Sequence, residues 1–319
     1  MEIDVKKITN LIEKSSKIII TSHKNLDLDA LGSVLAMYYV CKSLNKKAYL
    51  LINDEKYEFG VKRAFEKTKD LNIKTYSSKE LLKKVDEKTL LIVLDVNKPY
   101  LLQNEKILQK VKKNIVIDHH IKNTKSIDKS AYEYINTNES STCEIVLDIV
   151  SELNVYIPSY IATIMLSGIA IDTNNFYLKT TVHTYKALAK LKEFDANASE
   201  VQYLLKQDFK KYKDIQKIVI NTKFFENIGI ATGTKKYNKE DLAKAADSIL
   251  LFENVEASFV IGKISKNEIG ISARSLGNFD VQIIMEKMGG GGHKTDAATQ
   301  LKTRDLKEAN EKLLKSLKK

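Results

Sequence analysis

One stretch of the chain, residues 22–33 (SHKNLDLDALGS), constrains both its fold and its chemistry. It places one imidazole and two carboxylates, those of His23, Asp27 and Asp29, directly after an apolar run at residues 17–21. The run is rich in β-branched residues and predicts a buried strand, and the residues after the turn carry apolar side chains at helical spacing. The three polar groups therefore stand at the carboxyl end of a strand, where open α/β sheets usually bind their ligands.

This spacing of one histidine and two aspartates suits a metal site, but the pattern has a second interpretation. Asn and Asp are common turn residues after strands, and a lone histidine is often only a solvated side chain. The stretch alone leaves metal binding and turn formation equally open. A metal site therefore needs support from groups of the same chemistry elsewhere in the chain.

Such groups follow other predicted elements of the N-terminal half. Strands are predicted at residues 48–52, 90–94 and 115–117, and helices at residues 30–43, 79–85 and 101–112. Because strands alternate with helices, we expect an α/β fold with a mostly parallel, wound sheet. Asp95 directly follows the strand at 90–94, and the strand at 115–117 leads into Asp118, His119 and His120. Three acidic or histidine clusters thus fall at strand carboxyl ends.

Helices dominate the middle of the chain. Ser141 and Glu144 have the spacing of a capping box, which predicts that a helix begins there. Pro158 suits the first turn of another helix, which brings Asp172 to its end. Two more helices are predicted at residues 183–194 and 201–220, and we place the inter-domain linker in the second of them.

A second α/β unit is predicted to start near Phe224. Its strands are predicted at residues 227–232, 258–264 and 268–274, and its helices at residues 238–251, 280–288 and 305–317. Residues 289–293 form a glycine-rich loop before the last of these helices. A chain of 319 residues with 43% hydrophobic content is long enough for two globular domains.

Composition argues against several classes of protein. No apolar run approaches the ~18 residues of a membrane span, and residues 1–16 carry acidic side chains, unlike a signal or transit peptide, so we expect a cytoplasmic protein without membrane contact. Cys41 and Cys143 lie in amphipathic patterns, which favours reduced, buried thiols. The net charge of +11 suits an anionic substrate such as a nucleotide. The lysines are spread along the chain like solvated helix faces, so no long nucleic acid is expected as a partner.

The candidate ligands are rich in carboxylate oxygen, include imidazole nitrogen and lack sulfur. They are His23, Asp27, Asp29, Asp95, His119 and Asp172. Such a set suits Mn²⁺ or Mg²⁺ better than structural Zn²⁺, and the histidines favour Mn²⁺. The set is too large for one ion that also holds water and substrate, so we expect two ions about 3.5–4 Å apart. Such a pair activates water for attack on phosphorus, and the expected reaction is phosphoester hydrolysis.

Two features of the second unit are candidates for phosphate binding. The four glycines at residues 289–292 let the backbone approach a phosphate, and His293 could donate to its oxygens, although flexible loops use glycine as well. Arg274 ends a strand predicted beside that loop and can hold a phosphate with two N–H groups, against the alternative of a surface charge on an edge strand. His183 has no such neighbours in the predicted elements and is interpreted as a surface or core-edge histidine.

The order of these motifs resembles the DHH phosphoesterase superfamily with a C-terminal DHHA1 domain, and the resemblance covers nearly the whole chain. The catalytic motifs appear in the family's order: His23 with Asp27 and Asp29, then Asp95, then Asp118 with His119 and His120, then Asp172. Leu26 departs from the pattern, because the family often has proline there, which affects turn rigidity and no ligand. By resemblance, residues 1–195 would form a DHH metal-binding catalytic domain, residues 196–223 a helical linker, and residues 224–319 a smaller α/β DHHA1 substrate-binding domain.

The resemblance also implies a role for each site residue. One ion would be held by His23, Asp27 and Asp95, and the other by Asp29, Asp95, His119 and Asp172, so that Asp95 bridges them. The ions would be Mn²⁺, with Mg²⁺ or Co²⁺ as alternatives. The catalytic residues beside the ions would be Asp118 and His120. Asp118 would orient His119 or the start of a helix, and His120 would polarise the scissile phosphate or assist the leaving oxygen.

Segments of the second unit resemble the GdpP-type cyclic-di-AMP phosphodiesterases. They are residues 245–250, 255–259, 271–277 and 281–286. This resemblance implies a homodimer that hydrolyses cyclic di-AMP to 5′-pApA, with substrate contacts from Arg274, Ser275, Gly290, Gly291, Gly292 and His293. Proteins of that type carry membrane helices and sensory domains before the DHH unit, so we expect either a free-standing relative or the cytosolic catalytic part of a membrane-anchored protein. Two alternatives stay open: a phosphodiesterase or phosphatase for pApA, short oligoribonucleotides or 3′-phosphoadenosine 5′-phosphate, and a nucleotide sensor without hydrolysis.

Overall fold

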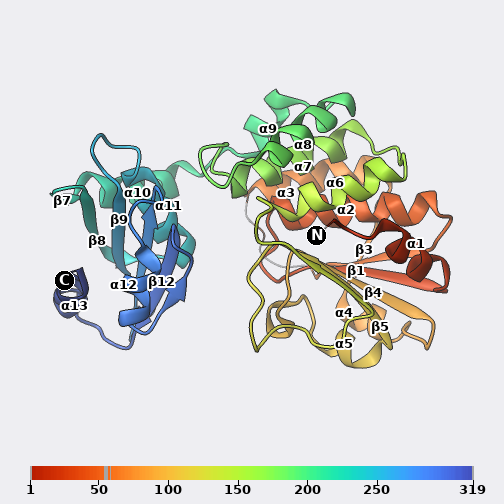
Figure 1. Ribbon diagram of the computed structural model, residues 1–319, viewed down its shortest axis with the longest axis horizontal. Helices are drawn as coiled ribbons and strands as arrows, with labels where there is room; N and C mark the ends of the chain where they lie inside the picture. The colour runs from red at the N-terminus through yellow and green to blue at the C-terminus, as the bar shows by residue number, and fades with distance from the viewer. Residues whose placement is uncertain (1, 54–56, 58, 318–319) are drawn as a thin grey trace. The chain divides into compact units, whose positions relative to one another are not determined.

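The structure, a computed structural model, describes residues 2–53, 57 and 59–317 (Figure 1). The chain forms two compact units, Met1–Lys206 and Gln207–Lys319. The predicted helix over residues 201–220 is wrong, because two helices, α9 (Ala198–Leu204) and α10 (Phe209–Ile220), replace it. The side chain of Asp208 accepts a hydrogen bond from the backbone N–H of Lys211 and so caps a new helix.

The first unit is built on a six-stranded sheet in the order β3-β2-β1-β4-β5-β6, in which all neighbours are parallel. Its strands are β1 (Lys17–Thr21), β2 (Ala48–Leu51), β3 (Thr75–Tyr76), β4 (Thr89–Leu94), β5 (Lys113–Asp118) and β6 (Tyr132–Ile135). Its helices besides α9 are α1 (Val5–Glu13), α2 (Leu28–Ser43), α3 (Phe59–Thr68), α4 (Ser78–Leu82), α5 (Lys106–Lys110), α6 (Thr142–Glu152), α7 (Ser159–Asp172) and α8 (Val182–Glu193). The predicted parallel, wound α/β sheet is confirmed.

Helices cover both faces of this sheet, which explains why its central strands are apolar throughout. Successive side chains of β1 point to opposite faces: Ile18 and Ile20 pack in the core under α2, α6 and α7, and Ile19 packs in the core with α4 and α5. Figure 1 shows these two helical layers above and below the sheet. The carboxyl edge of the sheet is left for loops and for the start of α2.

A close crossing of α2 and α7 fixes where α2 begins. A Cβ atom on Gly168 of α7 would lie only 2.6 Å from the Cα atom of Asp29. No larger residue fits this position without moving the backbone, so glycine allows the two helices to touch. Asp29, in the first turn of α2, is consequently held against the helix that ends at Asp172.

The predicted helix over residues 101–112 is largely wrong. A 3₁₀ turn covers Pro99–Leu101, and only α5 is α-helical. Leu102 and Gln103 are not helical, because they pair with the turn after β1. Leu102 forms an antiparallel bridge with His23, and the backbone N–H of Gln103 donates to the carbonyl of Ser22 at 3.0 Å. This pairing positions His23.

The second unit has a mixed sheet in the order β11-β12-β10-β9-β8-β7, in which only β8 and β9 are parallel neighbours. Its strands are β7 (Lys223–Phe225), β8 (Ile228–Lys236), β9 (Ala257–Lys263), β10 (Ile269–Ser275), β11 (Gly291–Gly292) and β12 (Asp296–Leu301). Its helices besides α10 are α11 (Lys239–Ile249), α12 (Val281–Lys287) and α13 (Leu306–Leu317). Phe259 packs on the face covered by α12 and α13, and Val260 on the face covered by α10 and α11. Within the described part of the chain, no helix has both the length and the apolar character to span a membrane.

Two expectations for the second unit are wrong. The glycine-rich segment is not wholly a loop, because Gly291 and Gly292 form the short strand β11 beside β12. The strand β12 itself has no counterpart in the prediction. Its presence places β10 inside the sheet, so Arg274 does not lie on an edge strand.

Candidate metal centre

The first group of the centre forms at the end of β1, where His23 faces two carboxylates. Its Nδ1 lies 2.5 Å from the carbonyl oxygen of Lys24, which can only accept, so Nδ1 carries the proton of this bond. The other ring nitrogen, Nε2, lies 3.5 Å from Oδ2 of Asp27 and 3.2 Å from Oδ2 of Asp95. A histidine oriented in this way presents Nε2 to a metal ion.

Asp95 lies between this group and a second one. It directly follows β4 with a left-handed backbone conformation (φ 59°), which aspartate tolerates better than most residues. Its Oδ2 faces His23, and its Oδ1 lies 3.5 Å from Nε2 of His119. The hydroxyl of Thr142 donates to Oδ1 at 2.9 Å and helps to fix the carboxylate.

The second group consists of Asp29, His119 and Asp172. Nε2 of His119 lies 3.4 Å from Oδ2 of Asp172, and this buried nitrogen has no hydrogen-bond partner among the described residues. The fully buried carboxylate of Asp29 accepts the backbone N–H groups of Thr142 and Cys143, both at 2.8 Å, at the N-terminus of α6. These bonds hold the charge at a helix N-terminus, where a negative charge is favoured.

The donor set fits divalent cations. In each of two sets, His23 with Asp27 and Asp95, and Asp29 with His119 and Asp172, the potential ligand atoms all lie within 4.8 Å of one another. The unpartnered Nε2 of His119 is the kind of buried polar atom that a metal ion satisfies. Oxygen and imidazole donors without sulfur suit Mn²⁺ or Mg²⁺.

Burial and neighbouring charges shift the pKa values of these carboxylates. Burial, together with the negative charge of Asp95, raises the pKa of Asp29 to about 7. Burial also raises the pKa of Asp172 well above its usual value, and the charge of Asp29 adds to this effect. Burial favours the neutral form of Asp27 too, but the adjacent His23 outweighs it and lowers the pKa of Asp27 to about 2. Without cations, the centre therefore concentrates more negative charge than it can easily hold.

Asp118 and His120 form a pair at the side of the centre. Oδ1 of Asp118 accepts from the backbone N–H of His119 at 2.8 Å and lies 2.8 Å from Nδ1 of His120. Burial lowers the pKa of His120, but the hydrogen bond to Asp118 and the charge of Asp95 outweigh it and raise the pKa to about 9. The His120 side chain is 54% exposed, so a protonated ring faces solvent beside the centre.

Comparisons with known proteins identify the family of this chain. The DHH family N-terminal domain matches residues 17–169, and the DHHA1 domain matches residues 224–319. The chain is a DHH/DHHA1 protein. The six predicted metal ligands and the pair of Asp118 and His120 thus come together at the carboxyl edge of the sheet in its DHH unit.

Relatives match almost the whole DHH/DHHA1 chain. It is 35% identical over 322 residues to the cyclic-di-AMP phosphodiesterase GdpP of Geobacillus thermodenitrificans, a match that covers 97% of this chain and 48% of the relative. This chain therefore spans about half the length of that relative. It is 29% identical over 306 residues to the bifunctional oligoribonuclease and PAP phosphatase NrnA of Thermus thermophilus, covering 94% of this chain and 89% of the relative.

A solved structure shares the fold of the DHH/DHHA1 chain. The exopolyphosphatase-related protein from Bacteroides fragilis superposes with a TM-score of 0.82 at 21% sequence identity. The match covers 98% of this chain and 95% of the other. At this level of identity the similarity establishes a common fold.

In the DHHA1 domain, Arg274 and two of the predicted glycines line one cavity of about 360 Å³. Nε of Arg274 donates to Oδ1 of Asp247 at 2.9 Å, and Nη1 donates to the carbonyl of Ala273 at 2.9 Å. Gly291 and Gly292 line the same cavity. The ion pair with Asp247 orients the guanidinium, so Arg274 is not the freely exposed charge of the alternative interpretation.

The remaining predicted residues of the DHHA1 domain have structural contacts of their own. Gly292 has a φ of 150°, and a Cβ there would lie 2.4 Å from Cα of Ala297, so packing against β12 already requires glycine. The hydroxyl of the fully buried Ser275 donates to the carbonyl of Lys294 at 3.2 Å, and the backbone N–H of His293 donates to the carbonyl of Asp296 at 2.6 Å. Gly290 is exposed next to β11.

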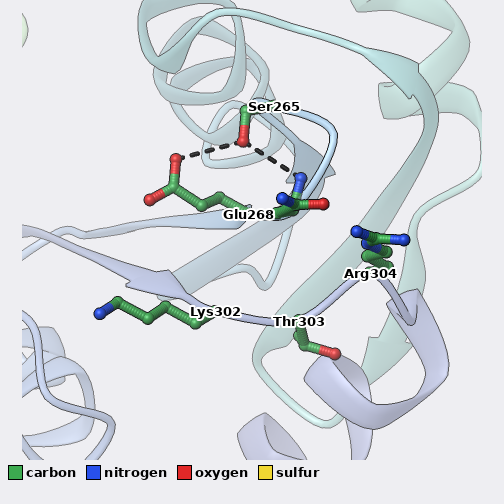
Figure 2. Close-up of a pocket in the computed structure, with 6 residues that line it drawn as sticks. Ser265, Glu268, Lys302, Thr303 and Arg304 are labelled. Atoms are coloured by element: carbon green, nitrogen blue, oxygen red, sulfur yellow. Dashed lines mark hydrogen bonds between the residues drawn. The ribbon is translucent and has the colours of Figure 1, made fainter.

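A second cavity of the DHHA1 domain, about 530 Å³ and open, lies at the turn between β9 and β10 (Figure 2). Ser265 donates to Glu268 at 3.2 Å on one side of it. Lys302, Thr303 and Arg304 line the other side (Figure 2). None of the predicted substrate contacts lies here.

Sequence reasoning missed the residues that support the metal ligands. The capping box at Ser141 forms only in part: Ser141 accepts from the backbone N–H of Glu144, but the Glu144 side chain is bound by the hydroxyl of Ser140. The adjacent Thr142 contacts Asp29 and Asp95. No local sequence pattern predicts these contacts, because the partners are 113 and 47 residues away. His183 is partly exposed, and Glu139 and Asp148 both bind its ring, which are contacts that the sequence did not predict.

Proposed function

We propose that the DHH/DHHA1 chain is a phosphodiesterase that hydrolyses one phosphodiester bond of cyclic di-AMP and releases 5′-pApA. One observation carries the proposal: six metal-ligand side chains converge at one edge of the sheet, around Asp95. The similarity to a cyclic-di-AMP phosphodiesterase over 97% of the chain supports the choice of substrate.

The proposed ligands divide into two sets that share Asp95. His23, Asp27 and Asp95 would hold one ion, and Asp29, Asp95, His119 and Asp172 the other. When bound, two Mn²⁺ ions would supply an activated water and neutralise charge on the phosphate. The hydrogen bond from Thr142 to Asp95 and the two N–H groups on Asp29 keep the carboxylates in place before ions or substrate arrive.

His120 is the proposed proton donor. Its protonated ring, oriented by Asp118, would donate a hydrogen bond to the scissile phosphate or a proton to the leaving oxygen. Exposure distinguishes it from its neighbours: the side chain of His120 is 54% exposed and that of His119 only 10%. His120 can therefore meet a substrate from solvent, whereas His119 serves the metal.

The DHHA1 domain is proposed to bind the rest of the substrate. Arg274 would hold a phosphate with its guanidinium, which Asp247 orients. At Gly290, Gly291 and Gly292 the absence of side chains would let a phosphate approach closely, and the ring of His293 would contribute an N–H donor. The backbone N–H of Gly290 itself donates to the carbonyl of Met285. Ser275 would act through the backbone of Lys294, which it holds next to His293. We further propose that the protein is a homodimer.

Product analysis tests the proposal. Cyclic di-AMP, cyclic di-GMP, pApA and short oligoribonucleotides are incubated separately with the protein and Mn²⁺, and the products are separated by ion-pair chromatography. We expect cyclic di-AMP to give accumulating pApA, and chelation or Asp95→Asn to stop the reaction. Tight binding of cyclic di-AMP without any product in saturating Mn²⁺ would contradict the proposal and indicate a nucleotide sensor.

A second candidate function is hydrolysis of linear substrates: pApA, short oligoribonucleotides or 3′-phosphoadenosine 5′-phosphate. The similarity to NrnA, at 29% identity over 94% of this chain, supports it. The same metal centre would serve either reaction. Fast loss of linear substrates with cyclic di-AMP nearly untouched would support this second function.

A further inference from the structure

A second cluster of metal-ligand side chains lies where α6 meets α8. Nδ1 of His183, in the first turn of α8, lies 2.6 Å from Oε2 of Glu139 and 3.7 Å from Oε2 of Glu144. Potential ligand atoms of these three residues all lie within 4.8 Å of one another. None of them belongs to the six ligands of the catalytic centre.

Glu144 is the feature of this cluster that a simple ion pair does not explain. Its side chain has no exposed surface, and Oε2 finds no hydrogen-bond partner in the part of the chain that the structure describes. Its other oxygen accepts from the hydroxyl of Ser140. A fully buried carboxylate oxygen without a hydrogen bond costs free energy unless a proton or a cation satisfies it.

The fourth member of the cluster, Asp148, prepares His183 for metal binding. Asp148 follows Glu144 by one helical turn, and its Oδ1 lies 2.9 Å from Nε2 of His183. A proton on Nε2 would bind this carboxylate and leave the lone pair of Nδ1 facing Glu139 and Glu144. Carboxylates orient metal-binding histidines in this way in many metal sites.

We propose that Glu139, Glu144 and His183 bind a third divalent cation, with Zn²⁺ as the best-suited ion. Zn²⁺ accepts both imidazole nitrogen and carboxylate oxygen as ligands, and three protein ligands leave the fourth position to water. Three carboxylates surround a single imidazole here, so a divalent charge balances the cluster better than one proton does. Asp148 is 48% exposed and His183 is 30% exposed, which gives the ion access from solvent.

The third cation would stabilise residues 139–144, the segment that contacts the catalytic carboxylates. Glu139 contributes its side chain to the cluster, and its backbone carbonyl lies 3.4 Å from Nδ1 of His119. Three residues later, Thr142 binds Asp29 and Asp95. An ion at Glu139 and Glu144 would therefore fix both ends of this segment, and its role would be to position catalytic ligands.

Metal counting tests this inference. The full chain, stripped of metal and dialysed against Zn²⁺, is analysed for bound zinc per chain by mass spectrometry. We expect three equivalents for the wild type and two for His183→Arg. Arginine keeps a positive charge among the three carboxylates but cannot ligate a metal, so the variant preserves an ion pair and removes the site. Equal zinc content in the two proteins would overturn the inference.

Two further variants separate this site from the catalytic centre. Glu144→Gln has the same shape and can still bind Ser140, so it provides the same test if His183→Arg does not fold; we again expect the loss of one equivalent. Asp95→Asn changes only the catalytic centre and is expected to keep the zinc bound at His183. Zinc that is lost with Asp95→Asn and retained in both other variants would assign every bound ion to the catalytic centre and contradict the third site.

Discussion

The hydroxyl of Thr142 donates a hydrogen bond of 2.9 Å to Oδ1 of Asp95, the oxygen that faces His119. Asp95 is the carboxylate shared by both proposed ion sites, so its orientation matters to each. A side chain that fixes a metal ligand without touching the metal typically contributes about 10–100-fold in metal affinity. We therefore expect Thr142→Val to weaken Mn²⁺ binding by about that factor in a calorimetric titration. Thr142→Ser keeps the hydroxyl and serves as the control, and equal weakening in both variants would show that the hydrogen bond is not responsible.

Asp95→Asn is expected to separate activity from stability. Removal of the shared carboxylate should lower the rate of product formation by about 1,000-fold or more. Burial already raises the pKa of Asp95, so the neutral amide should not lower the melting temperature of the metal-free protein. The measurements are a turnover assay and a thermal melt in chelator. A melting temperature well below that of the wild type would mean that Asp95 also has a structural role.

The stability of the metal-free protein should fall as pH rises. The folded state raises the pKa of Asp29 from near 4 to about 7, so its contribution is complete below pH 4 and is lost as pH rises through 7. Asp172 and Asp95 shift in the same direction. His119 opposes them, because burial lowers its pKa, but His23 and His120 have raised pKa values and act in the same direction as the aspartates. In urea unfolding with chelator, the free energy of unfolding should fall by on the order of a few kcal/mol between pH 5 and pH 8. Saturating Mn²⁺ should abolish this dependence of stability on pH.

Gly168→Ala should disturb the catalytic centre through the backbone. The added methyl group would lie 2.6 Å from Cα and 2.9 Å from N of Asp29, and neither backbone atom can move without shifting the start of α2. We expect a loss of about 1–3 kcal/mol in the free energy of unfolding, together with weaker Mn²⁺ binding. Gly291→Ala is the stability control, because a methyl group there meets nothing within 4 Å. Equal stability of the two variants would argue against a tight crossing of α2 and α7.

Arg274→Gln tests which cavity of the DHHA1 domain receives substrate. Loss of a charged hydrogen-bond donor to phosphate should raise KM about 10–100-fold, with a smaller effect on kcat. Arg304→Gln removes the same charge from the larger cavity shown in Figure 2 and should leave KM unchanged. A rise in KM for Arg304→Gln alone would place substrate at the turn between β9 and β10 instead.

The sequence predicts the parts of this fold that depend on local patterns. The apolar runs at β1 and β4 and the acidic or histidine residues that follow them are readable because strand burial and ligand spacing are local properties. The pairing of Leu102 with His23, which replaces a predicted helix, depends on residues 79 positions apart and leaves no periodic signal. The strand β12 was missed for a related reason, since its neighbour β11 consists of two glycines that carry no side-chain pattern.

In the candidate site, too, local features could be predicted from the sequence and long-range contacts could not. The metal-ligand candidates could be found because each follows a predicted strand or ends a predicted helix. The contacts of His183 could not, because Glu139 and Asp148 precede it by 44 and 35 residues and come together only when α6 packs on α8. When a residue on one element positions a ligand on another, the contact depends on tertiary packing. The sequence pattern within a single segment cannot predict it.

The segment from Glu139 to Cys143 carries one further consequence. It meets the metal ligands largely through its backbone: two amides on Asp29 and one carbonyl at His119. Backbone groups are present whatever the side chain, so most substitutions here should be tolerated as far as these contacts are concerned. The spacing along the segment is what must be kept, and a single inserted or deleted residue would move all three contacts out of register at once. In this protein, the length of a short connection is therefore constrained in its own right, in addition to the side chains of Glu139 and Thr142.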